Sequence, residues 1–276
     1  MSLLILPKKY SLDSVLVSKM IFDTHCHLNH EDLYPEIDRI ISDANKARVG
    51  KFLVVGYDKK TSLLAVKIAK KYENCYAAIG FHPTEIFDLS EEDYDEVMAL
   101  VNEDKVKAIG EIGLDYHWIK DPLQREIQKE YFIRQIEFAN HVGLPIVIHN
   151  RDSIEDCLSI LKEYPPVKGG IMHCYSGSVE SMREFIKLGM YISLGGPVTF
   201  TNAKTPKEVA CECPIDKLLV ETDSPYLTPH PFRGNRNEPK NISYVIQEIS
   251  RIRELSPKHI EEVTYNNALK ILNIDE

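Results

Sequence analysis

Eight short hydrophobic runs recur along the chain, and no other feature of the sequence restricts the possible folds as strongly. Each run is rich in aliphatic and β-branched residues and is almost continuously apolar, which is typical of strands that are buried on both faces of a parallel sheet. The expected strands are residues 21–25, 51–56, 75–80, 106–113, 144–150, 167–174, 190–196 and 217–223.

Helical patterns fill most of the gaps between these runs. Apolar residues that recur three or four positions apart mark one face of a helix. Gly50 is expected to end the first such helix and Gly143 the second, and Ser256 followed by Pro257 indicates the start of a further helix after residue 252. The helical faces lie at 37–47, 132–139 and 245–252.

Eight alternating strand and helix units over roughly 250 residues predict an α/β protein of the (β/α)8 or TIM-barrel type. A doubly wound open sheet is the alternative, but no glycine-rich phosphate loop follows the first strand. The sequence contains no linker-like tract, so we expect residues 20–276 to form a single barrel domain. Residues 1–19 are interpreted as an N-terminal extension of open status and are left out of the fold prediction.

Composition and charge indicate where the protein is located and how it would bind its partners. No apolar run approaches the roughly 18 residues that a membrane-spanning helix needs. The first apolar patch precedes its lysines, the reverse of a signal peptide, and six scattered cysteines form no disulfide pattern, so a cytoplasmic location is expected. With a net charge of −9, any nucleic acid would be bound through local basic groups and metal ions.

Histidines and carboxylates gather at the ends of the expected strands. The carboxyl ends of barrel strands converge on one face, where active sites lie. Six buried ionisable groups would be costly without a cation, and imidazole together with carboxylate suits divalent metals. The six residues are His25, His27, Glu111, His149, His173 and Asp223.

Each of these residues alone also has an ordinary structural explanation. His173 could be a hydrogen-bonded core residue, Glu111 could pair with a lysine, and Asp223 could form a turn before Pro225. Together they favour a metal site. Six ligands are more than one open catalytic ion uses, so the set predicts two ions that share a carboxylate and promote hydrolysis, with Zn, Mn, Co or Mg as candidates.

The stretch "IFDTHCHLNH" (21–30) contains more candidate ligands than we expect to bind metal. Side chains alternate across a strand, which places His25 and His27 on one face with Asp23 beside them. Cys26 is expected to point toward the helices as a packed thiol. His30 follows the strand and is not predicted to be a ligand.

Six motifs follow one another along the chain from about residue 20 onward. They are "DTHCHL" (23–28), "GFHP" (80–83), "GEIGLDY" (110–116), "IHNRD" (148–152), "HCYSG" (173–177) and "ETDSPYLTPHPFRGNRNEP" (221–239). Together they resemble the TatD family of metal-dependent hydrolases. The resemblance implies a TIM barrel and a metal-dependent deoxyribonuclease activity, typically 3′-to-5′ trimming of DNA.

The resemblance also implies roles for individual residues. His25, His27 and Asp223 would hold one metal, His149 and His173 the second, and Glu111 would bridge the pair. Asp223 would also orient the nucleophilic water or take its proton. His82, Arg151 and Arg236 are candidate contacts to the phosphates of a DNA or RNA substrate, with Arg236 favoured over Arg151. No membrane and no obligate protein partner is expected.

Two other functions remain open from the sequence. The same residues could hydrolyse an amide or ester bond, including that of an aminoacyl-tRNA, because an activated water attacks a carbonyl carbon as well as phosphorus. The acidic net charge mildly favours a small substrate over a long polyanion. The third hypothesis is a binding protein that retains barrel and metals without catalysis, and no sequence feature supports it.

Overall fold

All eight predicted runs are strands in the structure, a computed structural model that describes residues 21–275. The N-terminal extension expected at residues 1–19 lies outside these residues. The strands pair in parallel and in chain order within one sheet, which confirms the predicted barrel. They are β1 (Ile21–Cys26), β2 (Val49–Val55), β3 (Cys75–Ile79), β4 (Val106–Asp115), β5 (Ile146–Arg151), β6 (Gly170–Met172), β7 (Met190–Leu194) and β8 (Leu218–Val220).

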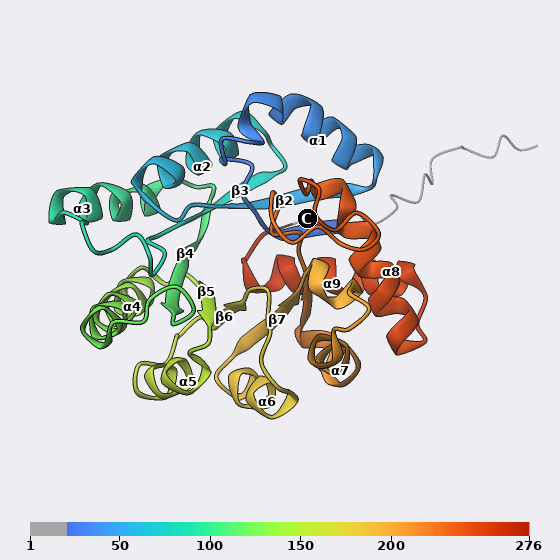
Figure 1. The fold of residues 1–276 in the computed structure, drawn as a ribbon. Helices are drawn as coiled ribbons and strands as arrows, with labels where there is room; N and C mark the ends of the chain where they lie inside the picture. Colours follow the sequence, from blue (N-terminus) through green and yellow to red (C-terminus); the bar gives the residue numbers. More distant parts are fainter. Residues whose placement is uncertain (1–20, 276) are drawn as a thin grey trace, which may run out of the picture.

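The helices up to α8 (Ile242–Arg253) surround the strands as an outer ring that follows the chain order (Figure 1). Within the described residues, none of them combines the length and the apolar character needed to cross a membrane. The helices are α1 (Ile37–Lys46), α2 (Lys59–Lys71), α3 (Glu91–Ala99), α4 (Pro122–Val142), α5 (Ile154–Glu163), α6 (Val179–Lys187), α7 (Lys204–Glu212), α8 (Ile242–Arg253) and α9 (Pro257–Ile271).

Helix boundaries agree with the sequence signals at two places and differ at one. Gly143 adopts the left-handed conformation (φ 72°) that ends α4, and the side chain of Ser256 caps α9. Gly50 does not end α1, contrary to the prediction, because it lies inside β2. The chain turns instead at Arg48, whose φ of 70° is positive.

The core has two layers. The outer layer packs the strands against the helices, whereas the inner layer fills the barrel with side chains such as Phe22, Tyr76 and Tyr191. These three residues lie near the amino ends of their strands, and α9 adds Leu269 and Leu272 to the same cluster. Helix α9 therefore covers the amino end of the barrel and leaves the carboxyl end for the polar residues.

The barrel closes where β1 meets the segment after β8. The hydroxyl of Thr24 donates to the carbonyl of Val220 at 2.9 Å, and the carboxylate of Asp23 accepts bonds from the backbone N–H (2.9 Å) and the hydroxyl (2.6 Å) of Thr222. Two backbone bonds continue the seam, from Asp223 N–H to the carbonyl of His25 and from His27 N–H to the carbonyl of Ser224. This seam fixes the segment after β8 against the end of β1.

Candidate metal centre

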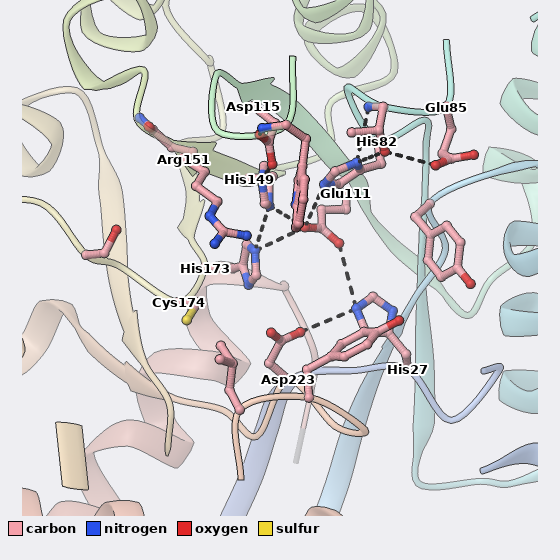
Figure 2. Close-up of a pocket in the computed structure, with 17 residues that line it drawn as sticks. His27, His82, Glu85, Glu111, Asp115, His149, Arg151, His173, Cys174 and Asp223 are labelled. Carbon is pink, nitrogen blue, oxygen red and sulfur yellow. Dashed lines mark hydrogen bonds and ion pairs between the residues drawn. The ribbon is translucent and has the colours of Figure 1, made fainter. Parts of the chain in front are cut away.

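The carboxyl ends of the strands surround a pocket of about 630 Å³. Histidines and carboxylates from β1, β3, β4, β5, β6 and β8, or from the loops that follow them, converge there (Figure 2). All six residues that the sequence selected as metal ligands are in this group. Five of them line the pocket, and His25 is fully buried directly beneath it.

One set of donor atoms comes from the seam between β1 and β8. The Nε2 atoms of His25 and His27 lie 3.2 Å apart. Oδ1 of Asp223 lies 3.7 Å from the first and 3.4 Å from the second. Three donor atoms thus converge within less than 4 Å, and a group of this kind can hold a metal ion.

A second set comes from β4, β5 and the residue after β6. Nδ1 of His149 and Nε2 of His173 each lie 3.0 Å from Oε1 of Glu111 and 3.4 Å from each other. The other carboxylate oxygen of Glu111, Oε2, faces the first set, at 3.4 Å from His25 Nε2 and 3.8 Å from His27 Nε2. Glu111 therefore presents one oxygen to each set of donors.

The chemistry of these donors fits divalent cations. Two imidazole nitrogens that face each other at 3.2 Å, with carboxylate oxygens beside them, form a satisfactory arrangement when they share a cation. Burial without a cation would leave several ionisable groups with only one another as partners, which is costly. Nδ1 of His25 is also buried without a hydrogen-bond partner among residues 21–275. The residues present therefore fit a metal centre.

His82 lies closer to this centre than a contact to substrate alone would require. It follows β3 by three residues and lines the pocket, with Nε2 3.8 Å from Oε1 of Glu111. Together with Glu111 and His149 it forms another group whose donor atoms are near enough to hold a metal. Its Nδ1 contacts the hydroxyl of Thr84 at 2.7 Å, which orients the ring.

Two buried carboxylates that the sequence analysis did not select support the histidines from behind. Oδ2 of Asp115 lies 3.0 Å from Nε2 of His149, and Oε1 of Glu221 lies 3.3 Å from Nδ1 of His173. Strand periodicity could have found both, because Asp115 is four residues after Glu111 on β4 and Glu221 is two residues before Asp223. Such partners orient metal-binding imidazoles and increase their basicity.

Electrostatics in the pocket follow from burial opposed by close opposite charges. Burial works against ionisation of Glu111, but the surrounding imidazoles, His173 and His25 foremost, hold its pKa well below the ordinary value. Burial likewise works against a charged His173, yet Glu111 and Glu221 raise its pKa well above the usual range. Burial and the nearby His149 lower the pKa of His82 to about 3, so this ring is neutral at physiological pH.

The two candidate arginines occupy different places. Arg151 lines the pocket, and its side chain extends into it (Figure 2). Arg236, which the sequence analysis favoured, is not part of the lining. Its guanidinium binds the carboxylates of Glu36 (2.8 Å) and Glu238 (3.0 Å), so its planar donors are used within the protein. The general pattern of an arginine in a loop after β8 could not reveal these partners.

The remaining candidates of the "IFDTHCHLNH" stretch are placed as follows. Cys26 packs in the outer core layer, as predicted. The side chain of Asp23 accepts bonds from the backbone N–H of His25 (3.4 Å) and from the backbone N–H and hydroxyl of Thr222, and it belongs to none of the three donor groups that the described residues form. Burial raises the pKa of Asp23 to about 8. The ring of His30 accepts a bond from the backbone N–H of Asp32 and belongs to none of the three donor groups found among residues 21–275.

Known proteins with similar sequences belong to one family of enzymes. Residues 22–273 match the model of the family described as TatD related DNase. YabD of Bacillus subtilis (strain 168), named as an uncharacterized metal-dependent hydrolase, is 49% identical over 257 residues, or 93% of this chain and 100% of YabD. YcfH of Escherichia coli (strain K12), named in the same way, is 33% identical over 259 residues, covering 92% of this chain and 96% of YcfH.

A solved structure of a similar protein has the same fold as this chain. The crystal structure of YJJV, a TatD homologue from Escherichia coli K12, superposes with a TM-score of 0.88 at 28% sequence identity. The match covers 92% of this chain and 98% of that protein. The resemblance inferred from the motifs is thereby confirmed, from β1 through α9.

Proposed function

Because the chain belongs to the TatD family of metal-dependent hydrolases, we propose that it hydrolyses phosphodiester bonds in nucleic acid, as a 3′-to-5′ exodeoxyribonuclease with a two-metal site. The observation that supports this proposal most strongly is the position of Glu111. Its two oxygens face two separate sets of donors in one pocket, and Arg151 lines the same pocket. Paired cations beside a guanidinium suit a substrate whose reacting group is an anionic phosphate.

The first ion would be held by His25, His27 and Asp223, and the second by His149 and His173, with Glu111 between them. Bound ions would lower the pKa of a water molecule and stabilise the negative charge on the oxygens of the attacked phosphate. Zn, Mn, Co and Mg are the candidates that this mixture of nitrogen and oxygen donors accepts.

The protein's own groups would position the substrate and handle the proton. Asp223 lies at the edge of the first donor set, with its side chain about one-tenth exposed to the pocket, so its carboxylate can orient a water molecule and accept its proton. Arg151 can form two parallel hydrogen bonds to phosphate oxygens. The neutral ring of His82 can bind a phosphate oxygen or complete the second donor set.

End-labelled oligonucleotides test the proposal directly. The protein is loaded in turn with Mg, Mn, Zn or Co and incubated with single-stranded DNA labelled at the 5′ end. We expect a ladder of products that shorten one nucleotide at a time, because digestion from the 3′ end preserves the label. Absence of shortening with all four metals would rule the proposal out.

A matched pair of variants distinguishes hydrolysis by this protein from hydrolysis by a contaminating nuclease. Asp223→Asn removes the proposed proton acceptor and a metal ligand, and it should lower activity by at least about a hundredfold. Asp216→Asn is the control, since it makes the same chemical change at an exposed residue beside the amino end of β8, on the opposite side of the barrel. Equal activity of the two variants would contradict the role of Asp223.

Hydrolysis of an amide or ester bond is the alternative that the same donors permit. A panel of dihydropyrimidines, lactones and aminoacyl-tRNA measured beside the oligonucleotides distinguishes the two reactions. Arg151 favours the phosphodiester, because it makes no ion pair with a carboxylate in the described part of the chain and is free to bind a substrate anion.

A further inference from the structure

An exposed tryptophan stands at the rim of the pocket. Trp118 lies in the loop between β4 and α4, lines the pocket, and keeps 67% of its surface accessible to solvent. Single exposed apolar residues are common on protein surfaces and need no function. Here, however, the large flat ring borders the site that would bind the substrate, so its surroundings are informative.

The loop that carries Trp118 is firmly attached. The backbone N–H of Trp118 donates to Oδ1 of Asp115 at 2.8 Å. Lys120 donates to the carbonyl of Tyr116 at 2.7 Å, and Arg125 donates to the carbonyl of Ile119 at 3.0 Å. The indole is therefore held exposed by a well-connected backbone, and little ordering would be needed for a ligand to use it.

The guanidinium of Arg151 lies beside this ring, with its central carbon 5.6 Å from the ring centre. The two residues belong to neighbouring segments, since Arg151 pairs with Asp115 in the ladder between β4 and β5. Among the pocket-lining residues in the described chain, Arg151 is the one Lys or Arg, while Glu85 lies on the β3 side. The carboxylates of Glu111 and Asp115 on β4 face His149, so Arg151 is the cationic group that can bind a phosphate on this side of the pocket.

We propose that Trp118 and Arg151 form a subsite for one nucleotide of an unpaired strand, with the base stacked on the indole and its phosphate bound by the guanidinium. This inference rests on the proposed nuclease function and specifies its substrate as single-stranded or frayed ends. A base within a duplex is already stacked and paired, so its face is not available to the ring.

Two other aromatic residues of the pocket are less suited to this role. Tyr57 and Tyr226 each pack edge-on against His27, with ring centres 5.5 and 6.0 Å away. Their contacts support a candidate metal ligand. Trp118 instead contacts His117 and Arg151 and has the larger exposed face.

Intrinsic fluorescence gives a direct test, because Trp118 is the only tryptophan in the chain. The protein is titrated with a single-stranded oligonucleotide whose phosphorothioate linkages slow hydrolysis. We expect saturable quenching by this oligonucleotide and little change with a strand of the same length that lacks bases at its 3′ end. A blunt duplex with the same linkages should also leave the emission unchanged.

Kinetics of variants separate stacking from a structural role. Trp118→Ala should raise KM for single-stranded DNA about tenfold with little change in kcat, and Trp118→Phe should restore part of the loss. On the strand that lacks terminal bases, Trp118→Ala should equal the parent protein. Phe232→Ala, which truncates another exposed aromatic residue in the loop after β8, is the matched control and should leave KM unchanged.

These experiments distinguish failure of the proposed subsite from failure of the nuclease proposal. If the parent protein shortens single strands but KM is unchanged in Trp118→Ala, the subsite is wrong and the nuclease proposal stands. An equal loss on the normal and the base-free strand would also overturn the subsite, since it would indicate a structural role. If the parent protein shortens no oligonucleotide with any metal, both proposals fail together.

Discussion

Asp115 lies directly behind His149, with its Oδ2 3.0 Å from Nε2 of the imidazole. The other ring nitrogen, Nδ1, faces Glu111 at 3.0 Å. The histidine is thus held between Glu111, which faces both donor sets, and Asp115, which belongs to none of the three donor groups found in the described part of the chain. Because Oδ1 of Asp115 also binds the backbone N–H of Trp118, the same side chain links the candidate metal centre to the rim of the pocket.

Asp115→Asn should weaken metal binding more than it weakens the fold. The amide can still accept the bond from Trp118, but it removes the negative charge that orients His149 and increases its basicity. We expect the metal concentration for half-maximal activity to rise about 10- to 100-fold. Titration of activity with Mn or Zn measures this change.

The control for this prediction is Asp152→Asn. Asp152 also lies beside a histidine, with its Oδ2 3.4 Å from Nδ1 of His117, but both groups are largely exposed outside the donor sets. Its substitution should leave the metal requirement unchanged. Identical titration curves for Asp115→Asn and the parent protein would show that the carboxylate does not tune His149.

Arg151→Gln should reduce the affinity for oligonucleotides and also the dependence of that affinity on salt. Removal of one phosphate contact by a cation lowers the slope of log K against log salt by about 0.7 for a single strand. Binding measured between about 50 and 200 mM salt gives this slope. Arg251→Gln on the exposed side of α8 is the control, and an unchanged slope in Arg151→Gln would exclude a direct phosphate contact.

Chelation should lower the thermal stability of the protein. An ion that binds only the folded chain at about 100 times its Kd adds about 2.7 kcal/mol to the free energy of unfolding. For a domain of this size that corresponds to a fall in Tm of roughly 5–10 °C when the metal is removed. The Tm of Glu111→Gln should respond much less to chelator, because the amide removes the negative charge that both donor sets share and replaces one of the two oxygens. An equal response would argue against a shared carboxylate.

The barrel and the convergence of the six candidate ligands were predictable because both depend on regular spacing. Strands buried on both faces are read from continuous apolar runs, and parallel strands in a barrel end on one face wherever their loops go. This is why His25 and Asp223, almost two hundred residues apart in sequence, could be expected to meet. The number and identity of the metal ions depend on solution chemistry and stay predictions.

The details that the sequence did not reveal depend on particular contacts. Arg236 was favoured as a phosphate ligand on its position after β8, yet it binds Glu36 and Glu238, which no spacing rule indicates. Asp23 was expected beside His25 and His27 from strict alternation, but the sequence did not indicate that its side chain would bind Thr222 and close the barrel. Gly50 was assigned to a helix end on propensity, although tertiary pairing places it within β2.

Thr222→Val should destabilise the barrel at its closing seam. The hydroxyl of Thr222 donates to the fully buried carboxyl group of Asp23 at 2.6 Å, and valine has nearly the same shape without the donor. The loss of a hydrogen-bond partner by this buried carboxyl group should lower the free energy of unfolding by about 1–3 kcal/mol. Urea denaturation measures the change, with Thr201→Val at an exposed position as the control. A midpoint equal to that of the parent protein, at an unchanged m-value, would show that the backbone bonds from Asp223 and His27 close the seam by themselves.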